Sequence, residues 1–214
     1  MSDELHPPET ITTFYLLRHG HTEPTENNKI YNDPQVALTE RGERQAHLQG
    51  VWLKDIKPTH LLSSTAVRVV STAKIIAEEI GMEAITVDDL NEWNVGTWEG
   101  RTYIDRKKNN PEEYHAWCAD PIANAPPEGE SIVDMCNRIR ERLKAITKTY
   151  EGSSIALVTH AGVIRSILLE ALGIPVRNFW RLSVPAGSVS RVDFSENFAT
   201  VYFMSLDPDL KKAL

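Results

Sequence analysis

Several signatures of cofactor chemistry are missing from this chain of 214 residues. It has only two cysteines, Cys118 and Cys136, and they form no Cys-x-x-Cys metal or redox motif. No His-x-x-x-His pair or carboxylate cluster has metal-ligand spacing, and the sequence has no glycine-rich phosphate loop. We therefore expect neither a metal nor another cofactor. Two isolated cysteines are typical of reduced thiols, which favours a cytoplasmic protein.

Long hydrophobic runs and an excess of positive charge are also missing. No apolar stretch approaches the roughly 18 residues of a membrane span. The formal net charge of -7 argues against general nucleic-acid binding. We expect no nucleic-acid partner and no membrane partner. The polar residues 1–12 lack the apolar core of a signal peptide, and we expect them to form a flexible tail.

The chain does have a regular alternation of short apolar runs and amphipathic helices. Its hydrophobic content of 41% is enough for one sizeable core. The alternation predicts an α/β fold in which a mostly parallel sheet has helices on both faces. The last two predicted strands are expected to form a hairpin. The six predicted strands span residues 14–17, 60–63, 84–87, 155–159, 188–194 and 200–205.

Helix signals lie between these strands. Thr39 is positioned to cap a helix that runs to about Lys54, and Ser131 with Asp134 resembles a capping box. Gly81 ends another helix. The apolar stripe predicted for that helix comprises Val67, Val70, Ala73, Ala77 and Ile80.

The segment at about 100–130 breaks the alternation. It is rich in charge, tryptophan and proline, and we interpret it as an inserted helical cap over the strand ends. Four aromatic residues in and beside it either line a substrate pocket or form the core of the cap: Trp93, Trp98, Tyr114 and Trp117.

Two histidines follow predicted strands. Arg18 and His19 come directly after the first strand, and His160 follows the strand at 155–159. Arg68 and Glu92 also follow predicted strands. The carboxyl ends of strands form the ligand-binding edge of an open α/β sheet, so we expect these five side chains to converge there. Any one of them alone would more simply be a structural or surface residue.

These residue types together support phosphoryl transfer through a phosphohistidine. His19 would be the nucleophile, and Arg18 and Arg68 would bind the phosphoryl oxygens. The two guanidinium charges should lower the pKa of His19 and keep it neutral. His160 would donate a hydrogen bond to a phosphoryl oxygen. Glu92 would protonate the leaving alcohol and then activate water.

Six sequence blocks then point to one family. They are LLRHGHT at 16–22, ALTERGERQA at 37–46, SSTAVRVVSTA at 63–73, LNEWNVGTWEG at 90–100, GES at 129–131 and VTHAGV at 158–163. In this order they resemble the histidine phosphatase superfamily, in its phosphoglycerate-mutase-like branch. The chain is most similar to the small phosphatases of that branch.

The resemblance implies a three-layer α/β/α sandwich without a metal, formed by a single domain over 13–214 with the small cap inserted at about 100–130. It implies the roles given above for the five site residues. Thr25 stands where the family often has an asparagine that contacts phosphate, and its hydroxyl can still donate one hydrogen bond. Ala161 completes the predicted phosphate-binding and substrate-binding residues.

Three functions fit this resemblance. The first is a phosphomonoester phosphatase that acts on a small phosphorylated metabolite. The second is a cofactor-dependent phosphoglycerate mutase, and the third is a non-catalytic phospho-ligand binding protein. The short stretch at 99–127 favours hydrolysis, because a mutase must shield its phosphohistidine from water. The substrate and the oligomeric state stay open, with a homodimer as one alternative.

Overall fold

The computed structural model describes residues 10–209 of the chain. They form one six-stranded sheet in the order β3-β2-β4-β1-β5-β6. The pairs β3–β2, β2–β4 and β4–β1 are parallel, and β1–β5 and β5–β6 are antiparallel. The predicted mostly parallel sheet and its closing hairpin are therefore confirmed. The strands are β1 (Thr12–Arg18), β2 (His60–Ser63), β3 (Ala84–Thr86), β4 (Ser154–Thr159), β5 (Val189–Phe194) and β6 (Ala199–Leu206).

Helices lie between most of the strands, and several of them begin at side-chain caps. The Thr39 side chain accepts a hydrogen bond from the Gly42 amide at 3.2 Å, and that of Ser131 accepts one from Asp134 at 3.0 Å. The helices are α1 (Glu23–Glu26), α2 (Glu40–Ile56), α3 (Val67–Ile80), α4 (Tyr103–Asn109), α5 (Pro111–Ala119), α6 (Ile132–Thr149) and α7 (Ala161–Ala171), with 3-10 turns η1 (Gly96–Trp98) and η2 (Val176–Arg181).

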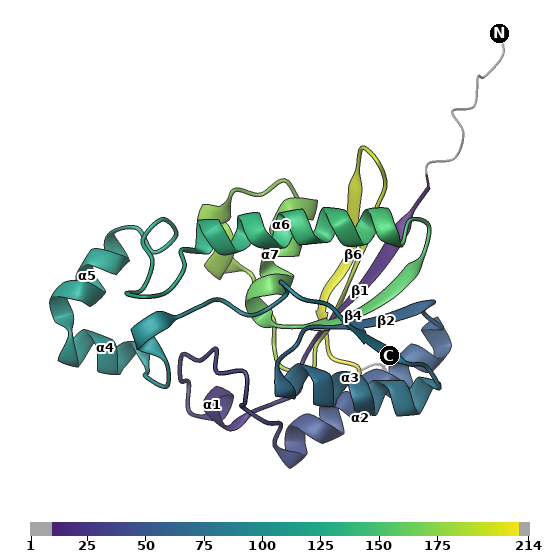
Figure 1. Cartoon of the computed structure of the whole chain (residues 1–214), viewed down its shortest axis with the longest axis horizontal. Helices are drawn as coiled ribbons and strands as arrows, with labels where there is room; N and C mark the ends of the chain where they lie inside the picture. Colours follow the sequence, from purple (N-terminus) through teal and green to yellow (C-terminus); the bar gives the residue numbers. More distant parts are fainter. Residues whose placement is uncertain (1–9, 210–214) are drawn as a thin grey trace, which may run out of the picture.

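The sheet is the middle of three layers. Phe14 and Leu16 of β1 belong to the core shared with α6 and α7, whereas Tyr15 and Leu17 belong to the core shared with α2 and α3. This alternation follows from the two-residue period of a strand. Figure 1 shows α6 and α7 on one side of the strands and α2 and α3 on the other. The predicted α/β/α sandwich is confirmed.

The predicted apolar stripe of α3 is partly wrong. Val70 lies outward and is 40% exposed, whereas Val69, Ala73 and Ile76 are buried. The buried face also contains Arg68. The inner face of α3 thus carries the charged Arg68, and the apolar Val70 lies on its outer face.

The segment expected to form the cap contains α4 and α5. Figure 1 shows both helices beyond the end of the sheet, beside the start of α6. Strand β1 begins at Thr12, inside the range expected for the tail, and residues 1–9 of that range lie outside the described residues. Within residues 10–209, no helix is long and apolar enough to cross a membrane.

Candidate active site

The two strand-end histidines meet at the carboxyl edge of the sheet. Strands β1 and β4 are parallel neighbours, and their register pairs Arg18 with Thr159. The next residue of each strand is a histidine, and the His19 amide donates to the Thr159 carbonyl at 3.0 Å. The imidazole rings of His19 and His160 lie 5.4 Å apart between centroids, at 70°. The sheet register therefore brings together two side chains that are 141 positions apart in the sequence.

His19 is held in one tautomer. Its Nδ1 lies 2.7 Å from the Gly20 carbonyl oxygen. A carbonyl only accepts, so Nδ1 carries the proton and Nε2 keeps a free lone pair. The side chain is 1% exposed. Burial first, and then the charges of Arg18 and Arg68, hold the pKa of His19 well below its usual value. The ring is therefore neutral at neutral pH.

Arg68 links the first turn of α3 to His160. Its Nη2 donates to His160 Nδ1 at 3.3 Å, and its Nη1 donates to the Asp33 carbonyl at 2.8 Å. Because Nδ1 accepts, the proton of a neutral His160 ring is on Nε2, which lies 3.3 Å from the Ser64 hydroxyl. Burial and the Arg68 charge hold the pKa of His160 well below its usual value.

Arg18 supplies a second guanidinium beside the histidines. Its Nη1 donates to the Val184 carbonyl at 2.7 Å. The Nε atoms of both Arg18 and Arg68 are buried and have no hydrogen-bond partner within residues 10–209. Buried donors without acceptors are costly, and guanidinium N–H groups match the oxygens of a phosphoryl group. The two arginines therefore give this edge of the sheet hydrogen-bond donors of the kind that bind phosphoryl oxygens.

Glu92 is tied to the first turn of α7. Its Oε1 accepts hydrogen bonds from the amides of Trp93 and Gly162, both at 3.0 Å, and its Oε2 shares the Gly162 amide at 3.1 Å. The side chain is half-buried. Since α7 begins directly after His160, this contact places the carboxyl group beside the histidine pair.

A salt bridge braces the loop on both sides of Glu92. Arg138 of α6 donates from Nη2 to Glu130 Oε1 at 2.6 Å and from Nη1 to the Asn91 carbonyl at 3.2 Å. Glu130 Oε1 also accepts from the Asn94 amide at 3.0 Å. The Arg138–Glu130 pair therefore holds the main chain on both sides of Glu92.

Thr25 lies in a small hydroxyl cluster. Its Oγ1 is 2.9 Å from Thr22 Oγ1 and 3.1 Å from the Tyr31 hydroxyl. The Tyr31 ring covers the Arg68 guanidinium, whose central carbon is 4.9 Å from the ring centroid. Thr25 thus contacts the residue that covers Arg68, and its own contact with phosphate stays a prediction.

A cavity of about 200 Å³ adjoins these residues. Arg18, Glu92 and Ala161 line it, so the predicted Ala161 does face the space beside the site. The loop at 28–31 forms one wall, and an antiparallel bridge from Ile30 to Arg101 holds that loop in place. The volume is below the 300 to 1,000 Å³ typical of drug-sized sites, so it fits a small ligand. The other walls are Trp93, Val95, Tyr103, Gly162, Arg165, Phe179 and Trp180.

The aromatic residues in and beside the cap region were expected either to form the core of the cap or to line a substrate pocket. Trp98 and Trp117 belong to the hydrophobic core, with Trp98 fully buried. Trp93 is buried and also lines the cavity, whereas Tyr114 does not line it. The core role is thus correct for Trp93, Trp98 and Trp117, and Trp93 also lines the cavity.

Several residues that line the cavity were not identified from the sequence as site residues, among them Arg165, Tyr31, Tyr103 and Trp180. Arg165 has a recognisable signal, because it lies four residues after Ala161 and hence on the same face of α7. Tyr31, Tyr103 and Trp180 come from loops and short helices whose placement depends on the tertiary fold. His21, in the LLRHGHT block, is buried, and its Nδ1 lies 2.9 Å from the Thr39 hydroxyl.

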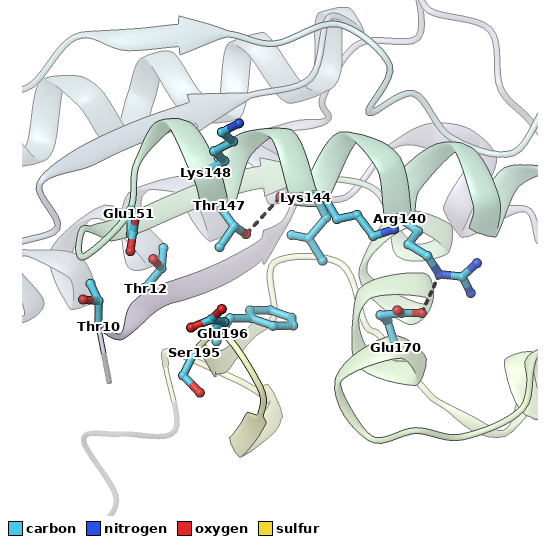
Figure 2. A pocket seen from close by; sticks show the side chains of 12 residues that line it. Thr10, Thr12, Arg140, Lys144, Thr147, Lys148, Glu151, Glu170, Ser195 and Glu196 are labelled. Carbon is cyan, nitrogen blue, oxygen red and sulfur yellow. Dashed lines mark hydrogen bonds and ion pairs between the residues drawn. The ribbon is translucent and has the colours of Figure 1, made fainter. Parts of the chain in front are cut away.

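A larger cavity, about 770 Å³, lies away from the histidines between α6 and the β5–β6 hairpin. Figure 2 shows that its lining mixes acidic and basic side chains, with an ion pair between Arg140 and Glu170. None of the five predicted catalytic residues lines it. Within residues 10–209, no group of three or more histidine, cysteine or acidic side chains is arranged to hold a metal ion.

Comparisons with known proteins identify the family of the chain. The probable phosphoglycerate mutase GpmB of Erwinia tasmaniensis is 33% identical over 184 residues, which cover 86% of this chain and 85% of that protein. A putative alpha-ribazole-5'-P phosphatase from Escherichia coli has a TM-score of 0.84 at 25% identity, covering 92% of this chain and 97% of its own. The alpha-ribazole phosphatase of Shigella flexneri has a TM-score of 0.83 at 26% identity, covering 91% and 96%. The family model for the histidine phosphatase superfamily (branch 1) matches residues 14–206, and the chain therefore belongs to that superfamily.

Proposed function

We propose that this protein is a phosphomonoester phosphatase that acts on a small phosphorylated metabolite through a phosphohistidine on His19. The observation that carries the proposal is the state of His19. Its Nδ1 proton is committed to the Gly20 carbonyl, so Nε2 is the free nucleophilic atom. Arg18 and Arg68 lie close enough to lower its pKa. A neutral imidazole beside two guanidinium groups is suited to attack a phosphate ester.

The first step transfers the phosphoryl group to the enzyme. His19 Nε2 bonds to phosphorus, and the bond from phosphorus to the ester oxygen breaks. Arg18 and Arg68 bind the phosphoryl oxygens, whose charge is spread in the transition state. The N–H at His160 Nε2 donates a hydrogen bond to one of these oxygens and keeps its proton. Glu92, in its protonated form, delivers a proton to the departing alcohol.

The second step returns His19 to its starting state. A water molecule attacks phosphorus, the bond between phosphorus and Nε2 breaks, and inorganic phosphate forms. Glu92, now ionised, accepts a proton from the attacking water and so becomes ready for the next cycle. No step uses a metal, and we therefore propose that the activity is metal-independent.

The mutase alternative rests on the similarity to the GpmB relatives, which are probable phosphoglycerate mutases. It requires an enclosed site that retains a bisphosphorylated intermediate and keeps water from the phosphohistidine. The cap region here carries only two short helices, α4 with seven residues and α5 with nine. This short cover favours hydrolysis. A non-catalytic binder would not need a carboxyl group held beside the histidine pair, as Glu92 is.

The test is phosphate release from a panel of phosphomonoesters, with a chelator present in a parallel series. We expect release that the chelator does not change, and acid-labile label on His19 after an alkaline quench. His19→Ala should lose at least a thousandfold in kcat, whereas His47→Ala, on the exposed surface, should keep wild-type activity. Label on another residue, or loss of activity in the chelator with recovery on adding a divalent ion, would contradict the mechanism.

A second assay separates the three functions. Incubation with 3-phosphoglycerate and 2,3-bisphosphoglycerate identifies a mutase if 2-phosphoglycerate forms without release of phosphate. A binding protein is identified if vanadate binds and no ester is turned over. A homodimer and a cytoplasmic location stay predictions, for solution scattering and cell fractionation to check.

A further inference from the structure

Ser64 lies against His160 at the carboxyl edge of the sheet. Strands β2 and β4 are parallel neighbours, and Ser63 is in register with Val158. Ser64 is the first residue after β2, and its amide donates to the Val158 carbonyl at 3.1 Å. Its hydroxyl oxygen lies 3.3 Å from Nε2 of His160, and both side chains are fully buried. The sheet register therefore fixes a hydroxyl group beside the second histidine.

The Ser64 hydroxyl accepts a hydrogen bond from this histidine. Its own proton is donated at 3.1 Å to Oδ1 of Asn91, an atom that can only accept. The other ring nitrogen of His160, Nδ1, accepts from Arg68 Nη2 at 3.3 Å. Burial and the charge of Arg68 hold the pKa of His160 well below its usual value, so the ring carries one proton. That proton is on Nε2 and is donated to the Ser64 oxygen.

The N–H group at His160 Nε2 has a second acceptor in the proposed reaction. It is the single hydrogen-bond donor of the neutral ring, and the proposed mechanism assigns it to a phosphoryl oxygen. Its contact with Ser64 is longer than the 2.9 to 3.0 Å, roughly, that is usual for N–H···O bonds. An ionised phosphoryl oxygen forms shorter and stronger hydrogen bonds than a hydroxyl does. Phosphate can therefore displace Ser64, and the free energy of the broken bond is subtracted from its binding.

We propose that Ser64 is a positioning residue for product release, whose hydroxyl oxygen takes back the His160 N–H group as inorganic phosphate leaves and so weakens phosphate binding. Only a hydrogen bond is exchanged, and no proton is transferred. Asn91 supports this role because it holds the Ser64 proton, which could otherwise be donated to the phosphate. The inference rests on the proposed function, because release of inorganic phosphate ends the proposed cycle.

The variant that tests this role is Ser64→Ala, which removes one oxygen atom and little volume. Without that oxygen, the His160 N–H group gives up no hydrogen bond when it binds a phosphoryl oxygen, so binding should be tighter. We expect the inhibition constants for inorganic phosphate and orthovanadate to fall about two- to tenfold, and KM for p-nitrophenyl phosphate to fall with them. The value of kcat should not rise, because substrate and transition state gain equally. General damage to the fold would weaken binding instead.

Two further variants accompany Ser64→Ala. Ser64→Cys keeps a weak acceptor at the same place and should give a smaller decrease in all three constants. Thr65→Val is the matched control, because the exposed Thr65 hydroxyl donates to the same Asn91 Oδ1 at 2.7 Å. It should leave the constants within about twofold of the wild type. An equal decrease in Thr65→Val would assign the effect to Asn91 and its loop and would overturn the role of Ser64.

Calorimetry with orthovanadate tests the inference without turnover. In a His160→Ala protein, which lacks the ring N–H group, adding Ser64→Ala should change the vanadate affinity by less than about twofold. A decrease in the dissociation constant that persists in this background would show that Ser64 does not act through His160. Unchanged or weaker vanadate binding in Ser64→Ala would also overturn the inference, even if the wild type is an active phosphatase. A protein that shows the predicted binding pattern but hydrolyses no ester would instead overturn the proposed function and leave the competition between Ser64 and the anion standing.

Discussion

The amide of Gly162 donates to both carboxylate oxygens of Glu92, at 3.0 Å to Oε1 and 3.1 Å to Oε2. A β-carbon on Gly162 would overlap Oε1. Glycine therefore lets the first turn of α7 approach the carboxylate closely. Because His160 immediately precedes α7, this one contact sets the position of the proposed proton donor relative to the histidine pair.

Gly162→Ala should displace the Glu92 carboxyl group without removing it. We expect kcat to fall about a hundredfold for alkyl phosphates, whose leaving groups need a proton, and less than about fivefold for p-nitrophenyl phosphate. Glu92→Gln should show the same selectivity between esters. Equal losses on both esters, together with a lower unfolding temperature, would mean that the substitution damages the fold instead.

Arg138→Gln should act on the same carboxylate from the other side. The substitution releases the Asn91 carbonyl and leaves Glu130 without its partner, so the loop that carries Glu92 loses its brace. We expect kcat for alkyl phosphates to fall about tenfold with KM nearly unchanged. Arg140→Gln on the same helix breaks an ion pair with Glu170 and is the control. A rise in KM as the main effect would mean that Arg138 acts on substrate binding.

Tyr31 should restrict anion access to Arg68. Its ring lies over the guanidinium, and such a contact is worth about 0.5–2 kcal/mol. Tyr31→Ala removes that competing contact, so orthovanadate should inhibit at a two- to tenfold lower concentration. The control is Tyr202→Ala, which removes a similar ring from Arg191 far from the site. Weaker vanadate inhibition in Tyr31→Ala would show instead that the ring helps to form the anion pocket.

The buried histidines should make stability depend on pH. The pKa values of His19 and His160 are held well below 6.5 in the folded protein and return to about 6.5 on unfolding. Below pH 6.5 the unfolded chain therefore binds more protons, and stability falls as pH decreases. Each histidine contributes up to about 1.4 kcal/mol per pH unit in that window, and its contribution is fully present above it.

Urea unfolding at pH 5, 6, 7 and 8 measures this effect. His160→Gln should flatten the fall in unfolding free energy between pH 6 and 5 relative to the wild type. His115→Gln, on the exposed face of α5, should leave the slope unchanged. A slope in His160→Gln as steep as that of the wild type would contradict the lowered pKa.

The strands β1 and β4 were predictable from the sequence because they are short, mostly apolar runs bounded by turns. Strand β2 was predicted at its observed bounds, and β3 differs by one residue. Helix faces were harder to predict. The α3 stripe was wrong at Val70 because the pattern counted apolar residues only, whereas the inner face of this helix carries Arg68.

The site was predictable to the extent that strand ends determine it. The structure brings His19, His160, Arg18, Arg68 and Glu92 together, since parallel strands end at one edge. The position of the loop that covers Arg68 was not predictable from the sequence. The position of Tyr31 depends on the bridge from Ile30 to Arg101, which joins two loops through main-chain atoms and leaves no residue pattern.

The size of the cavity lined by Arg18 and Glu92 has a consequence for the proposed transfer of the phosphoryl group. At about 30 Å³ per water molecule, its volume corresponds to about seven waters when it is empty, and to fewer once a substrate's alcohol occupies it. In the proposed mechanism, water and that alcohol compete for the phosphohistidine. The reverse transfer, in which the alcohol recovers the phosphoryl group, becomes a measurable branch of the reaction. The yield of glycerol phosphate in a glycerol-containing buffer therefore measures how far the cavity restricts the access of water to the proposed phosphohistidine.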